Sequence, residues 1–103
     1  MISLDAATQR AQEIAVWKLL VSTILVHVAK THEYFTSDDI WDTGARKALP
    51  KGVDGRTLGA CLRTAGQMKI IEPTEIYRPS TQGTNNKRPV RVWRSRIYEK
   101  PQT

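Results

Sequence analysis

The helical spacing of apolar residues ends near Lys69, and two strand-like segments joined by a polar turn follow it. Before Lys69, apolar residues recur at steps of three and four, which is typical of helices. After it, residues 70–78 and 90–94 are rich in Val, Ile, Tyr and Trp, and Pro79 and Pro89 bracket the turn. We therefore predict a mainly α chain with one small antiparallel β-hairpin, an α+β fold. The 103 residues are enough for one domain with a modest core.

The first predicted helix covers residues 6–30, with Asp5 as its N-cap. One apolar strip suits the core and comprises Ile14, Trp17, Val21, Ile24, Leu25 and Val28. A second apolar strip comprises Val16, Leu19, Leu20 and Val26. Two interpretations of the second strip remain open: it lies under the hairpin or the C-terminal tail, or it forms the interface of a homodimer.

Residues 35–41 carry an aspartate version of the capping box, with Thr36 as N-cap and Asp39 three positions later. Phe35 and Ile40 occupy the positions of a hydrophobic staple. This pattern predicts a second helix over residues 37–48. Its expected buried residues are Ile40, Trp41, Ala45 and Leu49.

The third predicted helix covers residues 55–68, after a turn at 49–55 that contains Pro and two Gly, and Asp54 is its expected cap. Its inner face comprises Leu58, Cys61, Leu62, Ala65 and Met68. Its outer face comprises Arg56, Ala60, Arg63 and Gln67, with Thr57 and Thr64 at the borders. The segment between Gly55 and Met68 contains no acidic residue, so this outer face is polar and cationic.

The positive charge is concentrated in the second half of the chain. Residues 1–50 carry a net charge of about −1 and residues 51–103 about +7, which together give the net charge of +6. A neutral scaffold joined to a cationic third helix and hairpin is typical of nucleic-acid-binding proteins.

The order of the elements resembles a winged helix-turn-helix domain, and more narrowly the small winged-helix proteins of tailed bacteriophages. The resemblance rests on residues 35–41, 56–60 with Arg63 and Ala65, 71–74 and 88–95. It implies one domain over residues 1–95, made of a long N-terminal helix (1–31), a helix-turn-helix (36–68) and a wing (70–95), with a frayed or docking tail at 96–103. Such domains usually place a Gly between the third helix and the first wing strand, where this chain has Met68 and Lys69. A non-Gly residue there would cost roughly 1 kcal/mol in the left-handed conformation, so we expect a differently shaped helix end.

The resemblance implies a double-stranded DNA-binding protein whose third helix enters the major groove. Arg56 and Arg63 are two helical turns apart and can each pair with guanine. Gln67 suits adenine or a phosphate, Thr57 and Thr64 suit phosphates or thymine methyls, and the small Ala60 lets the backbone approach closely. The expected wing contacts are Arg78, Asn85, Asn86, Lys87, Arg88, Arg91 and Arg94. If about five of these basic side chains contact phosphates, the slope of log affinity against log salt should be near −4 to −5.

Two other binding functions remain open. The cationic face could bind an acidic protein, such as a host factor. RNA is less favoured, because the wing lacks an exposed aromatic platform on which single-stranded bases would stack.

The sequence does not indicate an enzyme, a metal or a cofactor. No Ser–His–Asp or His–Cys set is recognisable, His27 suits packing within the first helix, and Cys61 suits the core. Asp38 and Asp39 resemble part of a carboxylate cluster, but capping and the helix dipole explain them. The single cysteine, the shortness of the apolar run at 14–28 and the lack of a signal-peptide pattern favour a cytoplasmic protein, with no membrane contact.

Overall fold

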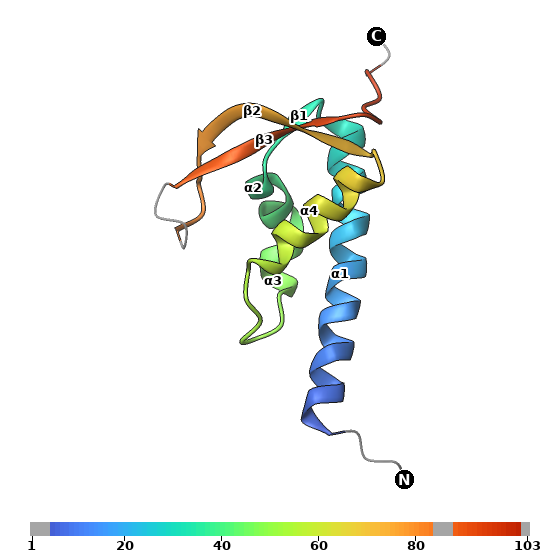
Figure 1. Cartoon of the computed structure of the whole chain (residues 1–103), viewed down its shortest axis with the longest axis vertical. Coiled ribbons are helices and arrows are strands. Elements are labelled where there is room, and N and C mark those ends of the chain that lie inside the picture. Colours follow the sequence, from blue (N-terminus) through green and yellow to red (C-terminus); the bar gives the residue numbers. More distant parts are fainter. Residues whose placement is uncertain (1–4, 84–87, 102–103) are drawn as a thin grey trace.

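A computed structural model describes residues 5–83 and 88–101, and it is an α+β fold of helices packed beside a small antiparallel sheet (Figure 1). The molecule measures 56 × 32 × 25 Å, and its length comes from one long helix that extends beyond the other elements at its N-terminal end. The three-stranded sheet lies across the opposite end of the molecule. The α+β class predicted from the sequence is confirmed.

Helix α1 (Ala6–Thr31) begins where the sequence predicts, because the amide of Thr8 donates to the Asp5 carboxylate at 2.8 Å. Its core side is Trp17, Val21, Ile24, Leu25, Val28 and Ala29, whereas Ile14 is only half-buried. His27 is exposed, so its predicted packing role is wrong: the core side of the helix passes through Ile24, Leu25 and Val28, and position 27 faces solvent.

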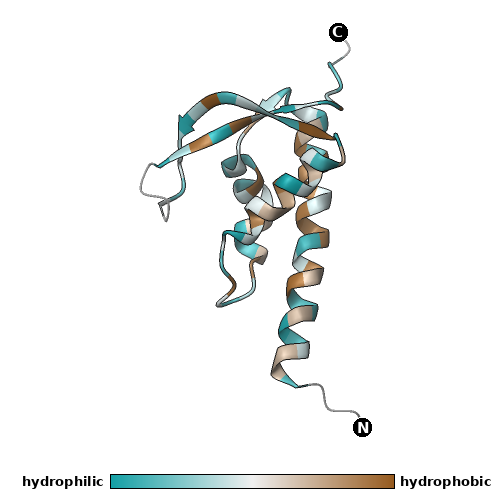
Figure 2. Cartoon of the chain, viewed as in Figure 1, coloured by the Kyte–Doolittle hydropathy of each residue, from teal (hydrophilic) through white to brown (hydrophobic). Residues whose placement is uncertain are grey.

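The second apolar strip of α1 is left uncovered at Val16 and Leu19, whereas Val26 is half-buried beside Ile70. Leu19 is 70% exposed and Val16 is similarly exposed, while Leu20 borders a shallow hollow against Ala48 and Pro50. Figure 2 shows apolar residues spaced along much of this helix. By its length and its mean hydropathy of 1.5, α1 is long and apolar enough to cross a membrane, although the run at 14–28 alone is too short. Core helices of soluble proteins can have the same length and hydropathy. In α1, 33% of the most apolar 18-residue stretch is buried inside the fold.

The second helical segment begins with the predicted capping box, in which the Thr36 amide donates to the Asp39 carboxylate at 2.8 Å. The segment is not one helix over 37–48 as predicted. It is divided into α2 (Ser37–Ile40), a wider turn η1 (Trp41–Ala45) and α3 (Arg46–Ala48). The division occurs at Gly44, whose φ of 129° suits glycine alone. The Ala45 carbonyl accepts instead from the Trp17 indole N–H at 3.0 Å, which fixes the segment against α1.

Helix α4 (Thr57–Gln67) starts two residues later than predicted, after a turn in which the Asp54 carboxylate accepts from the Arg56 amide at 2.9 Å. Leu58, Leu62 and Ala65 are buried as expected and Cys61 is half-buried. The predicted burial of Met68 is wrong. Met68 ends the helix with its side chain 66% exposed, at the border of the hollow between α1 and α4.

The end of α4 has the common left-handed shape despite the missing glycine. Lys69 has a φ of 62°. The Lys69 amide donates to the Gly66 carbonyl and the Ile70 amide to the Ala65 carbonyl, both at 3.1 Å, which are the two bonds of a Schellman motif. The expectation of a differently shaped helix end is therefore wrong, and Lys69 carries the strain.

The sheet contains one strand that the sequence did not reveal. The predicted hairpin is present as β2 (Ile71–Pro79) and β3 (Pro89–Ser95), with Pro79 opposite Pro89 at its outer end. β1 (Tyr34–Phe35) pairs with the other edge of β3, so the strand order is β1-β3-β2. β3 is therefore hydrogen-bonded on both sides. It connects the hairpin to β1, which lies directly before the N-cap of α2, Thr36.

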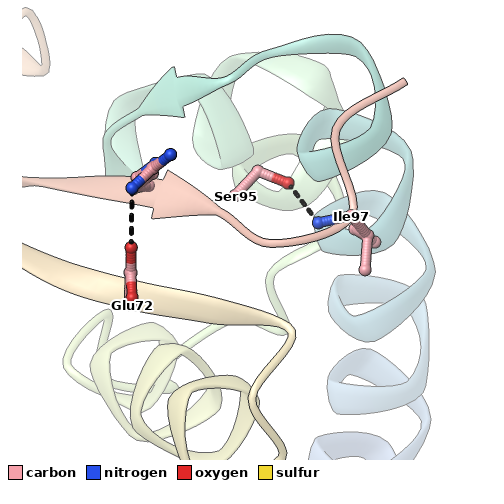
Figure 3. A network of polar contacts seen from close by, with 4 residues as sticks. Glu72, Ser95 and Ile97 are labelled. Atoms are coloured by element: carbon pink, nitrogen blue, oxygen red, sulfur yellow. Dashed lines mark hydrogen bonds and ion pairs between the residues drawn. The ribbon is translucent and has the colours of Figure 1, made fainter. Parts of the chain in front are cut away.

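The inner end of the hairpin is fastened to α1 and to the start of the tail, and Figure 3 shows the contact with the tail. The Ser95 hydroxyl donates to the Ala29 carbonyl and accepts from the Ile97 amide at 3.1 Å. Beside it, Arg94 forms an ion pair with Glu72 on the neighbouring strand at 3.4 Å. The tail then docks rather than frays as far as residue 99, whose amide donates to the Lys30 carbonyl at 3.0 Å.

Candidate nucleic-acid interface

The outer face of α4 is open to solvent. Arg63, Thr64 and Gln67 are exposed, and Thr57 and Ala60 are half-buried. Arg56 precedes the helix with its side chain 94% exposed, and its contact with Asp54 is long at 4.0 Å. The side chains predicted to face a partner therefore do face solvent, on one side of one helix.

A groove lies between the start of α4 and strand β3. It has a volume of about 570 Å³. Four arginines line it, namely Arg46, Arg56, Arg88 and Arg91, against one carboxylate, Asp54. Between the charges its wall is apolar, with Leu58, Leu62, Val90, Trp41 and Trp93. The cationic surface of the helix is therefore continuous with that of the hairpin.

The arginines of the wing and of α4 differ in the number of contacts that their side chains make within the protein. Arg91 donates to the Thr74 carbonyl at 3.0 Å and to the Tyr77 hydroxyl at 2.7 Å, and Arg94 is paired with Glu72. By contrast, within the described part of the chain the side chains of Arg63, Arg78 and Arg88 form no hydrogen bond or ion pair. Arg63, Arg78 and Arg88 can therefore bind a partner without breaking an internal contact.

Three of the predicted wing contacts, Asn85, Asn86 and Lys87, lie outside the described residues. The roles of all the predicted contacts toward DNA stay predictions. Trp93 is half-buried at the wing root, where a Cβ on Gly66 would lie 3.6 Å from its ring, and Val92 is fully buried.

A buried carboxylate fixes the connection that follows β2, and the sequence did not indicate it. Asp38 is only 6% exposed. Its carboxylate accepts from the Ser80 hydroxyl at 2.9 Å, from the Thr81 amide at 2.7 Å and from the Thr81 hydroxyl at 3.3 Å. The outer end of the hairpin is thereby attached to the first turn of α2. Serine and threonine after a proline are ordinary turn residues, so no local signal distinguishes this contact.

Two further contacts hold the same connection. Gln82 donates from Nε2 to Asp42 at 2.8 Å and accepts at Oε1 from Nη2 of Arg46 at 3.2 Å. The guanidinium of Arg46 also lies over the Trp41 ring, 4.1 Å from its centroid. Arg46 was absent from the predicted site, because the sequence places it on the second helix, away from the cationic outer face of the third.

Tyr77 contradicts the expectation that the wing lacks an exposed aromatic side chain. Its side chain is 52% exposed on β2, and the Arg91 guanidinium lies 5.3 Å from the centre of its ring. The wing therefore does present an aromatic surface, so the lack of one no longer argues against RNA.

Two observations concern metal binding and the single cysteine. No group of three or more His, Cys, Asp or Glu side chains among them could hold a metal ion. Burial raises the pKa of the Cys61 thiol, an effect that Lys18 partly opposes, and this favours the neutral thiol over the more reactive thiolate.

Comparisons with protein-family models, with curated proteins and with solved structures found no match to this chain.

Proposed function

We propose that this chain is a winged helix-turn-helix protein that binds double-stranded DNA without catalysis. In this proposal α4 enters the major groove, and the β2–β3 wing lies on the neighbouring backbone and minor groove. The resemblance to bacteriophage proteins leads us to include a role in transcription or another DNA transaction in the cytoplasm of a bacterial host.

The observation that carries the proposal is the continuous cationic surface from α4 to the wing. Arg56 at the start of α4 and Arg63 on its outer face are both exposed, and Arg56 lines the same groove as Arg88 of the wing. The order α1, β1, α2–α3, α4, β2, β3 with sheet order β1-β3-β2 supports the winged-helix assignment. With Arg56, Arg63, Arg78 and Arg88 on four phosphates, log affinity should fall against log salt with a slope of about −3.6.

The test is a titration of a labelled mixed-sequence duplex at several salt concentrations, with the variant Arg56→Ala/Arg63→Ala. We expect salt-dependent binding by the wild type and a loss of about tenfold or more in the variant. The matched control is Lys30→Ala/Lys100→Ala, which removes the same charge from exposed positions outside the groove.

Three results would contradict DNA binding through α4. The wild type could show no salt-dependent affinity, the two double variants could bind equally, or a single-stranded RNA could bind more tightly than the duplex. Capture of an acidic protein by the wild type but not by Arg56→Ala/Arg63→Ala, with no duplex binding, would favour a protein-interaction function instead.

We further propose that two copies associate through the exposed strip of α1. Val16 and Leu19 are exposed in adjacent turns of a helix that extends beyond the body, and Leu20 lies beside them. Soluble monomers rarely leave such a strip uncovered. Light scattering at high micromolar concentration should return about twice the 11.7 kDa of one chain, and Leu19→Lys should restore the monomer mass; a wild-type monomer would refute the association.

A further inference from the structure

The groove between α4 and β3 has the chemistry of a sugar–phosphate site. Its arginines come from three separate parts of the chain: Arg46 from α3, Arg56 from the start of α4, and Arg88 and Arg91 from the wing. Arginine matches phosphate with two parallel N–H bonds. The apolar wall between these charges, with Leu58, Val90 and Trp93, suits the carbon face of a deoxyribose.

The position of the groove agrees with the proposed function, on which this inference rests. Adjacent major and minor grooves of DNA are separated by one sugar–phosphate backbone. A protein with α4 in one groove and the wing at the next must have that backbone between the two elements. The arginine-lined groove is the space that lies between them.

Arg46 is the residue in this groove that neither the third helix nor the wing supplies. Its guanidinium is oriented by the Trp41 ring at 4.1 Å and by Gln82 at 3.2 Å. Gln82 is in turn held by Asp42, so the arginine is positioned before any partner arrives. A positioned cation loses less conformational entropy on binding than a mobile one.

We propose that the groove between α4 and β3 binds the DNA backbone that separates the two occupied grooves, and that Arg46 contacts its phosphate. Arg46 thereby extends the interface from the helix and the wing to the second helical segment. The contact is independent of base identity, since phosphates carry no sequence information.

The experiment compares Arg46→Ala, Arg46→Lys and Lys47→Ala with the wild type in the same salt-dependent duplex titration. Lys47 is the next residue, is exposed and does not line the groove, so Lys47→Ala removes one positive charge without touching the site. For Arg46→Ala we expect affinity to fall about tenfold, and the salt slope to become less steep by about 0.9. Arg46→Lys should keep the slope and bind with intermediate affinity, because it retains the charge but not the fork.

The outcomes separate this inference from the proposed function. If the wild type binds, Arg56→Ala/Arg63→Ala is weakened, and both Arg46 variants match Lys47→Ala, the groove assignment is wrong while DNA binding stands. If the wild type shows no duplex binding, both are wrong. Thermal unfolding of each variant shows whether a loss of affinity is caused by misfolding. If Arg46→Ala does not fold, Arg46→Lys becomes the deciding variant. An affinity of Arg46→Lys equal to that of the wild type would refute a bidentate phosphate contact.

Discussion

Replacing Asp38 with Asn tests whether the buried carboxylate holds the outer end of the hairpin. The three donors to Asp38 are the Ser80 hydroxyl and the amide and hydroxyl of Thr81. An Asn can keep its oxygen at the Thr81 position, but its NH₂ must then face Ser80, whose hydroxyl already accepts from the Gln82 amide at 3.1 Å. The substitution therefore weakens the two bonds from Thr81 and removes the bond from Ser80, without leaving a cavity.

The magnitude follows from the change in bond type. A hydrogen bond to a charged group contributes about 1.5–3 kcal/mol and a neutral one about 0.5–1.5 kcal/mol. Two of the three bonds survive as neutral ones, and the cost of burying a charge is removed, which offsets part of the loss. We therefore expect Asp38→Asn to lower the free energy of unfolding by about 1–2 kcal/mol. Asp38→Ala also strands buried donors and should cost about 3 kcal/mol. At 4–8 °C per kcal/mol, the Asn variant should melt roughly 4–16 °C below the wild type.

Urea unfolding followed by circular dichroism measures this loss, and hydrogen exchange at the Thr81 amide locates it. The matched control is Asp42→Asn, which makes the same substitution at an exposed carboxylate that accepts one bond from Gln82. We expect that control to change stability by less than about 0.5 kcal/mol. Equal effects of the two substitutions, or an unprotected Thr81 amide in the wild type, would refute the attachment.

Lys69→Gly should raise the free energy of unfolding by about 0.5–1 kcal/mol in urea, because it relieves the left-handed strain at φ 62°; an unchanged or lower value would contradict this. Cys61 should react with a thiol reagent at pH 8 more slowly in the folded protein than in urea, because burial raises its pKa above 9.0 and reduces the thiolate; equal rates would count against it. The bond from the Thr8 amide lowers the pKa of Asp5 below 3.8. Ionised Asp5 therefore stabilises the start of α1 above pH 3.8, and this contribution is lost as the pH falls through the lower folded value. The Thr8 amide shift, followed by NMR, should titrate with a midpoint below 3.8.

The parts of the fold predicted correctly depend on neighbours in the sequence. The cap at Asp5 and the capping box at Thr36 and Asp39 are bonds across three residues, and both are present. The strand segments and the prolines at their outer ends are equally local, and Pro79 does pair with Pro89. The exposed face of α4 followed from helical spacing alone.

The parts that failed depend on contacts between distant residues. The division at Gly44 accompanies a bond from Trp17 to Ala45, 28 residues apart, whereas the local pattern favoured one continuous helix. β1 is only two residues long, and its pairing with Arg94 and Trp93 defines it. Within the candidate site, Arg46 was missed for the same reason: its place in the groove depends on Trp41 and on Gln82, 36 residues away.

The middle strand of the sheet is the last one to leave the ribosome. Until residues 89–95 are synthesised, neither β1 nor β2 has its partner, because both pair only with β3. A nascent or truncated chain that stops before Pro89 would expose the unpaired edge of β2 to other chains, including the apolar Ile71, which is buried and pairs with Ser95 in the folded protein. Termination before β3 would therefore yield a product that aggregates, rather than a shortened chain that folds.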